Sequence, residues 1–205
     1  MSRVIKCTYA REDGSQYEKN VELLDGINTI EAASFSHSEY LTEVVIPEGI
    51  TYLDDGAFAQ CKNLLKVEFP KELTKIGNRA FFSCTSLKNI HLPNQLTSIG
   101  NFAFASCVEL KEITIPNSVT EIGEFAFMEC YKLERVVLSE NISTIKIGTF
   151  ELCEILKDVV IHKGITEVCE YSFALCRNLS SARIKSKETK ISKEAFEKYT
   201  KVIYE

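Results

Sequence analysis

Large apolar side chains recur along this chain at a fixed interval of 23 residues. Each repeat contains one phenylalanine at the same position. Most repeats also carry a small residue directly before this phenylalanine, a cysteine three residues after it and a leucine six residues after it. A repeat period of 20–50 residues is typical of a solenoid, in which each repeat forms one coil of a stack. The interval is set by eight phenylalanines: Phe35, Phe58, Phe81, Phe104, Phe127, Phe150, Phe173 and Phe196.

A short run of alternating apolar and polar residues follows each leucine, as in Ile113, Thr114 and Ile115. Such alternation predicts a strand of about three to five residues, because successive side chains of a strand point to opposite faces. In four repeats a proline closes the run, and proline has no N–H to continue a strand ladder. These are Pro47, Pro70, Pro93 and Pro116.

The second half of each repeat predicts a bend and a short helical piece. Gly77, Gly100 and Gly123 each lie four residues before a repeat phenylalanine, where we expect a bend that needs a positive φ. The segment from the glycine to the cysteine is too short for a full helix, so one α or 3₁₀ turn is expected. Eight such coils, spaced by about 4.8 Å, would form a rod roughly 35–40 Å long.

The two ends of the chain depart from the repeat. Residues 1–26 alternate apolar and polar side chains on both sides of a turn at residues 12–15, which predicts a β-hairpin that caps the first coil. Residues 27–188 hold the tandem repeats, and residues 189–205 a last partial repeat with a C-terminal cap. Such ends favour a complete small protein over a slice of a longer array.

The repeat from Leu110 to Cys130 reads L-x-x-I-x-I-P-x-x-V-x-x-I-G-x-x-A-F-x-x-C. Over about residues 27–196, this pattern resembles the BspA-like leucine-rich repeat family. The resemblance implies an α/β repeat fold: a right-handed leucine-rich-repeat solenoid with a parallel sheet on its concave side and short helical or 3₁₀ turns on its convex side. It also implies binding rather than catalysis, since such proteins are mostly surface or secreted adhesion molecules.

Repeats five to seven depart from this pattern. Ser139, His162 and Lys185 stand where proline is expected, and Lys146 and Cys169 stand where glycine is expected. The departures leave the fold prediction unchanged, but the curvature of the C-terminal half is not fixed by the pattern.

Composition and charge narrow the class of partner. The 205 residues are 45% apolar, enough for one core, and carry a net charge of −5. This acidic balance favours neither nucleic acid nor an anionic membrane as the main partner, and no apolar stretch is long enough to span a bilayer. No signal peptide is recognisable in residues 1–26. We therefore expect a cytoplasmic protein, or a cell-surface or secreted one if a leader was removed or export is unconventional.

Eight cysteines could indicate disulfides or a metal site, but their spacing favours packing in the core. Neighbours in the cysteine column would lie at about the coil spacing of 4.8 Å, whereas a disulfide needs about 3.8 Å between Cβ atoms. The chain has no C-x-x-C or H-x₃-H zinc motif. We expect reduced thiols and no metal or other cofactor. The column comprises Cys61, Cys84, Cys107, Cys130, Cys153 and Cys176.

No constellation of residues predicts an enzyme. His37, His91 and His162 fall in three different columns and do not cluster. His91 should lie near Glu68, and a Glu–His pair can serve in acid–base catalysis, but no nucleophile accompanies it and a solvated histidine is the favoured interpretation. The chain also has no glycine-rich phosphate loop and no nucleophile elbow.

The outward positions of the predicted strands form the candidate binding surface. They alternate with the core positions and make two columns of mixed charge, with an apolar step at Val137 and Val160. One interpretation is a partner site centred on Arg135, Val137, Asp158, Val160 and His162; the other is that valine suits any exposed strand. The predicted concave-face site comprises Glu43, Val45, Lys66, Glu68, Asn89, His91, Glu112, Thr114, Arg135, Val137, Asp158, Val160, His162 and Arg183.

A second apolar group is expected on the convex side. Phe102, Phe125 and Tyr171 share the column two residues before the repeat phenylalanine, so their rings should stack along the solenoid. Packing at the edge of the core is one interpretation, and self-association through an exposed apolar patch is the other.

Together these features predict a non-enzymatic leucine-rich-repeat module that binds another protein through its concave sheet. Two roles remain open. Adhesion or host interaction at a cell surface is implied by the family resemblance. An intracellular scaffold or adaptor is favoured by the unpaired cysteines and by the missing signal peptide.

Overall fold

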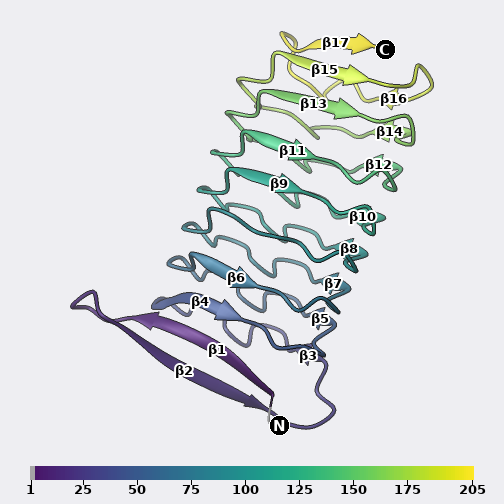
Figure 1. The fold of residues 1–205 in the computed structure, drawn as a ribbon. Helices are drawn as coiled ribbons and strands as arrows, with labels where there is room; N and C mark the ends of the chain where they lie inside the picture. Colours follow the sequence, from purple (N-terminus) through teal and green to yellow (C-terminus); the bar gives the residue numbers. More distant parts are fainter. Residues whose placement is uncertain (1–2) are drawn as a thin grey trace.

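The computed structural model describes residues 3–205, which form a solenoid of eight stacked coils, one for each phenylalanine of the column (Figure 1). Met1 and Ser2, which belong to the predicted N-terminal cap, lie outside the described residues. Neighbouring coils pair through parallel strands, with Val44 of one coil opposite Val67 of the next. The predicted solenoid with parallel strand pairing is confirmed.

Two rows of strands run along the stack, and every coil contributes to both except the third, which has a strand in the second row only (Figure 1). We call the side that carries the longer strands the strand face. The longer strands are β4 (Leu41–Val45), β6 (Lys66–Glu68), β9 (Glu112–Thr114), β11 (Arg135–Val137), β13 (Asp158–Ile161), β15 (Ser181–Ile184) and β17 (Lys201–Tyr204). The second row comprises β3 (Thr29–Ile30), β5 (Tyr52–Leu53), β7 (Lys75–Ile76), β8 (Ser98–Ile99), β10 (Glu121–Ile122), β12 (Thr144–Ile145), β14 (Glu167–Val168) and β16 (Lys190–Ile191).

A hairpin covers the first coil. β1 (Arg3–Ala10) and β2 (Gln16–Leu23) pair antiparallel, and β1 pairs antiparallel with β4, so the hairpin extends the strand row by two strands. Ile5 and Cys7 of β1 are buried against the first coil. The edge of β4 is therefore not left open. The domain boundaries at residues 26 and 188 stay a prediction.

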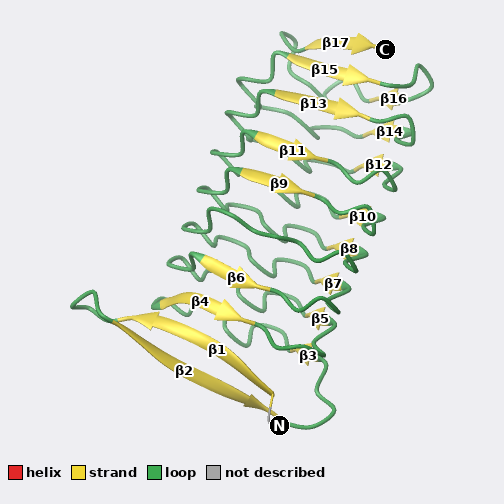
Figure 2. Cartoon of the chain, viewed as in Figure 1, coloured by secondary structure: helices red, strands yellow, loops and turns green. Residues whose placement is uncertain are grey.

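The expected α or 3₁₀ turn is not confirmed: residues 3–205 contain turns and no helix (Figure 2). In most coils the residues two before and two after the phenylalanine have positive φ, as do Phe102 (55°) and Ser106 (59°). A left-handed residue at every fourth position interrupts a right-handed helix. The main-chain N–H of Phe104 instead donates to the carbonyl of Ala126 in the next coil, at 2.8 Å.

The glycine column has a different cause from the one predicted. Gly77, Gly100 and Gly123 are absent from the residues with positive φ, so the expectation of a left-handed bend is wrong. A Cβ placed on Gly100 would lie 2.6 Å from the main-chain nitrogen of Asn78 and the carbonyl carbon of Gly77. Glycine occurs here because the backbones of successive coils approach too closely for a side chain.

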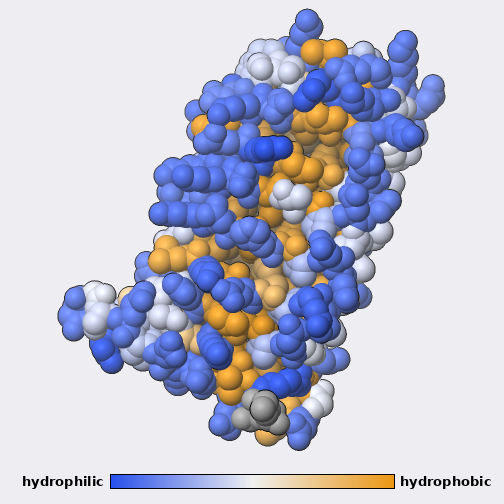
Figure 3. Space-filling model, viewed as in Figure 1, coloured by the Kyte–Doolittle hydropathy of each residue, from blue (hydrophilic) through white to orange (hydrophobic). Residues whose placement is uncertain are grey.

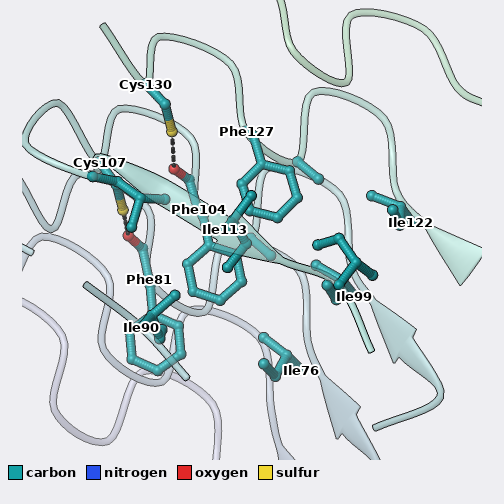
Figure 4. Packing of buried hydrophobic residues seen from close by; sticks show 14 of the residues in the cluster. Ile76, Phe81, Ile90, Ile99, Phe104, Cys107, Ile113, Ile122, Phe127 and Cys130 are labelled. Atoms are coloured by element: carbon teal, nitrogen blue, oxygen red, sulfur yellow. Dashed lines mark hydrogen bonds between the residues drawn. The ribbon is translucent and has the colours of Figure 1, made fainter. Parts of the chain in front are cut away.

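The repeat phenylalanines form the centre of the core. Their rings stack from Phe35 to Phe196 with neighbouring centroids 5.0–5.4 Å apart, and the six middle rings are fully buried. Figure 4 shows Phe81, Phe104 and Phe127 between isoleucines of the two strand rows. One coil could not bury its ring alone, and stacking joins the rings into one continuous core.

The cysteine column adds hydrogen bonds to this core. In each of six coils the Sγ donates to the carbonyl of the phenylalanine in the coil before, at 3.0–3.4 Å. Figure 4 shows two of these bonds, from Cys107 to Phe81 and from Cys130 to Phe104. Burial raises the pKa of Cys107 to about 12. The protonated thiol is therefore the form that packs here, and all eight cysteines are free.

Candidate functional site

The strand face presents the two outward columns that the alternation predicts. Val136 and Val159 point into the core, whereas the neighbouring Val137 and Val160 are 39% and 36% exposed. Eleven of the fourteen predicted site residues lie in β4, β6, β9, β11, β13 or β15. The other three are Asn89 and His91, in a coil with no strand on this face, and His162, just after β13.

Apolar surface follows the length of this face. Figure 3 shows it as a hydrophobic stripe between two hydrophilic margins, in the view in which the longer strands lie in front. Phe69 and Leu92 pack against the core but are only partly buried. The core is therefore incompletely covered on this side, and a partner could bury additional apolar area here.

Two hollows of the face share a wall. The first has a volume of about 580 Å³ and lies over the third, fourth and fifth coils, between Leu92 and Val137. The second has a volume of about 270 Å³ and lies over the fifth to seventh coils, where Val160 lines it. Arg135 and Val137 border both hollows. The predicted centre of the site thus lies where the two meet.

The hydrogen-bonded strand row is interrupted at these hollows. No main-chain hydrogen bond joins Asn89–Leu92 to either neighbouring coil, as far as the described residues 3–205 show. A second interruption separates β11 from β13. The row therefore consists of three separately bonded sections: the first ends at β6, the second is β9–β11 and the third is β13–β15–β17.

The charges of the face are partly satisfied within the chain. Lys66 pairs with Glu68, and Arg183 pairs with Asp158 at 3.1 Å. Glu112 and Arg135 occupy the same register position on adjacent strands. In the described part of the chain neither of them takes part in an ion pair. Both side chains are exposed and available to a partner.

The histidines of the predicted site differ in their surroundings. The Nε2 of His162 donates to the carbonyl of Ser139 at 2.8 Å, and its Nδ1 accepts from the main-chain N–H of Gly164 at 3.1 Å. Both ring nitrogens are thus committed to the backbone, and His162 lines the second hollow as a wall residue. His91 is exposed, and the carboxylate of Glu68 pairs with Lys66 rather than with His91.

The turns around the repeat phenylalanines carry the other predicted group, the column of Phe102, Phe125 and Tyr171. Phe102 and Phe125 stack with centroids 4.9 Å apart, and the guanidinium of Arg79 lies 5.4 Å from the centroid of Phe102. Tyr171 does not extend this stack, because Gly148 holds the intervening position and the ring of Phe125 fills the space where its side chain would be. The predicted stacking is confirmed for the two phenylalanines and wrong for Tyr171, which is 44% exposed.

Two polar ladders were not recognised in the sequence. In one, the hydroxyls of Thr74 and Thr97 each donate at 2.9 Å to the carbonyl of the equivalent residue one coil earlier. In the other, the Oδ1 of Asn78 accepts from the N–H of Asn101, whose Oδ1 accepts from the N–H of Glu124. Threonine seven residues before the phenylalanine was the available signal. These ladders fix the coil spacing on which the strand face depends.

Neither a group of metal-binding side chains nor a membrane-spanning helix is found among residues 3–205. Across residues 3–205, histidine, cysteine, aspartate and glutamate side chains form no group of three or more that could hold a metal ion. Within the same residues no helix has the length and apolar character needed to cross a bilayer. The features that remain are an apolar stripe, several hollows and unpaired charges.

Comparison with models of known protein families identifies the family of this chain. The model of the BspA type leucine rich repeat region, in six copies, matches residues 14–134 and 74–203. These matches include most of the chain, which therefore belongs to the BspA-type leucine-rich repeat family. No curated protein is similar enough to count as a match.

Solved structures of similar fold come from bacteria. A leucine-rich repeat protein from Bacteroides ovatus is 26% identical with a TM-score of 0.62, over 98% of this chain and 70% of that one. A leucine rich cell surface protein from Faecalibacterium prausnitzii is 27% identical with a TM-score of 0.57, over 85% of this chain and 62% of that one. The leucine rich repeat protein of T. pallidum is 27% identical with a TM-score of 0.65, over 81% and 86% of the two chains.

Proposed function

We propose that this protein is a non-enzymatic module that binds another protein through its strand face. The observation that carries the proposal is the apolar stripe (Figure 3) together with two hollows of the face that meet at Arg135 and Val137. Apolar surface of this kind on a soluble fold marks an interaction site. A central apolar group edged by an unpaired arginine is the composition of a binding hot spot.

The role proposed first is adhesion or host interaction at a cell surface. It is supported by family membership and by the similar protein from Faecalibacterium prausnitzii, which is described as a cell surface protein. An intracellular scaffold is the alternative, supported by eight free cysteines. Protease treatment of intact source cells distinguishes the two roles. Release of peptides from this chain while cytosolic markers stay protected supports the surface role. Release only after lysis contradicts it.

The binding face is tested by changing Val137 and Val160 to lysine together. Two charges in the stripe should lower retention of the partner at least tenfold, because burying an unpaired charge costs more than the contact provides. Immobilised protein is incubated with extracts of host and source cells, and the retained proteins are quantified by mass spectrometry.

A matched variant carries Leu24→Lys and Leu175→Lys, two exposed leucines away from the strand face. It should retain the same proteins as the unchanged chain. If the valine variant still folds, as judged by its melting curve, and binds as the control does, the strand face is not the binding site.

A further inference from the structure

The outward columns of the strand face hold their charges in an order that matches no two like charges about the middle of the stack. Glu112 on β9 and Arg135 on β11 lie on either side of the boundary between the fourth and fifth coils. Moving outward by equal steps from this boundary, each charged residue has a counterpart that is either of opposite charge or neutral. The matched positions in the first column are Asn89 and Asp158, Lys66 and Ser181, and Glu43 and Lys201; in the second they are Glu68 and Arg183.

A two-fold axis parallel to the strands turns this order into complementarity. The axis lies in the plane between the two copies, above the boundary between β9 and β11. Rotation about it reverses the order of the coils and keeps each residue at its position along the strand. Glu112 of one copy then lies opposite Arg135 of the other, and Glu68 lies opposite Arg183. A two-fold interface repeats every such pair twice.

The remaining positions of the second column form one apolar pair and two pairs of an apolar with a polar residue under the same axis. Thr114 comes to lie opposite Val137, His91 opposite Val160 and Val45 opposite Ile203. No two like charges are opposed in the two columns. At the hydrophilic margin Lys111 lies opposite Glu134, which is favourable, and Lys88 lies opposite Lys157, which is not, but exposed charges at a margin are well screened by water.

We propose that the strand face binds a second copy of this chain, face to face, about this two-fold axis. The inference rests on the proposed function, because it names the occupant of the same face. The charge complementarity and the apolar stripe together argue for a second copy, since a surface that evolved for an unrelated partner has no reason to be complementary to itself.

The central pair should contribute more than the outer ones. Glu112 and Arg135 form no ion pair within residues 3–205 of one chain, so association creates their contact without breaking another. Glu68 and Arg183 must first give up Lys66 and Asp158. The central contacts also lie beside the first hollow, where association would displace water and strengthen charge pairs.

The test uses charge reversal in the full chain and sedimentation velocity over a range of concentrations. The unchanged protein should move from a 23.2 kDa species to one of twice that mass as its concentration rises, and added salt should weaken the association. Arg135→Glu alone and Glu112→Arg alone should each weaken it about tenfold or more, because each places two pairs of like charges opposite each other.

Mixing the two single variants in equal amounts should restore the dimer, since every central pair of the mixed species again joins opposite charges. The control is Lys75→Glu, an exposed residue of the second strand row with the same change of charge, which should associate as the unchanged protein does. Rescue on mixing is not expected from variants that merely misfold.

The proposal is overturned if the unchanged protein stays monomeric at every concentration, or if the mixture associates no better than the single variants. In that case, if the variant with lysine at Val137 and Val160 no longer retains proteins from the extracts, the strand face binds a foreign protein and not a second copy of this chain. If that variant also binds as before, both fail. If the dimer forms but Arg135→Glu leaves it unchanged, association uses another surface, such as the one around Tyr171.

Discussion

At the scale of single residues, the surroundings of the cysteine column explain why cysteine occurs there. The position leaves room for one small side chain between coils, and the phenylalanine carbonyl of the coil before needs a donor that reaches it. Alanine would fit but has no hydrogen-bond donor. Serine would donate a hydrogen bond, but burying its hydroxyl in an apolar core costs more free energy than burying a thiol. A protonated thiol meets both needs, because it is a small hydrophobe with a weak S–H donor.

Raising the pH above about 9 should destabilise the fold through these thiols. Burial raises the pKa of Cys107 from its ordinary 9.0 to about 12, and raises that of Cys84 and Cys130 well above 9.0. Between pH 9 and 12 the unfolded state therefore binds fewer protons than the folded state, so the free energy of unfolding falls as the pH rises. Each such thiol lowers it by up to about 1.4 kcal/mol per pH unit in this window.

Thermal melts between pH 7 and 11 measure this slope. Cys107→Ala should be less stable at pH 7 and should show a shallower fall above pH 9, because one raised thiol pKa has been removed. An equal slope in the two proteins would show that the buried thiols are not the cause.

At the scale of the elements, alternation was enough to predict the strands but not the turns. A strand buries every second side chain, so its pattern is visible within one repeat. The small residue, phenylalanine and cysteine at close spacing suggested a helical turn. The main-chain N–H groups of the phenylalanine and of the residue two after it in fact donate to the next coil, as from Phe104 to Ala126 at 2.8 Å and from Ser106 to Met128 at 2.7 Å. The N–H of the cysteine stays within its own coil, as from Cys107 to Phe104 at 3.2 Å. A single repeat cannot show where a hydrogen bond to its neighbour goes.

The interrupted strand row leads to a prediction for hydrogen exchange. Within residues 3–205 the amides of Asn89–Leu92 have no main-chain acceptor, whereas β9 and β11 are paired in register. Amides without a partner exchange through small local fluctuations. Peptides that cover Asn89–Leu92 should therefore exchange about tenfold or more faster than peptides that cover Arg135–Val137, as measured by mass spectrometry. Equal protection of the two segments would show that the third coil is bonded in solution.

At the scale of the whole molecule, the strand face was the part of the site that the sequence could predict. In-and-out alternation placed Val137 and Val160 outward, and both are exposed. The engaged nitrogens of His162 and the two hollows could not be foreseen. They depend on Ser139, Gly164 and the missing ladder at the third coil, which lie in different repeats or show no mark in the pattern. Periodicity predicts what every coil shares, and the proposed binding surface consists of what the coils do not share.

The fixed period itself predicts how the molecule tolerates deletion. Removing residues 97–119 takes out one complete interval of 23 residues and joins Leu96 to Thr120, which is equivalent to Thr97. The phenylalanine, cysteine and threonine columns stay in register, and each coil contacts only its neighbours. The shortened chain should fold and melt cooperatively. Loss of one coil interface should lower its Tm by several degrees, since about 1 kcal/mol corresponds to about 2–4 °C for a chain of this size. Removing residues 97–108 instead would place a strand against a turn and should leave the chain unfolded by circular dichroism. If both deletions behave alike, register between coils is not what holds the solenoid together.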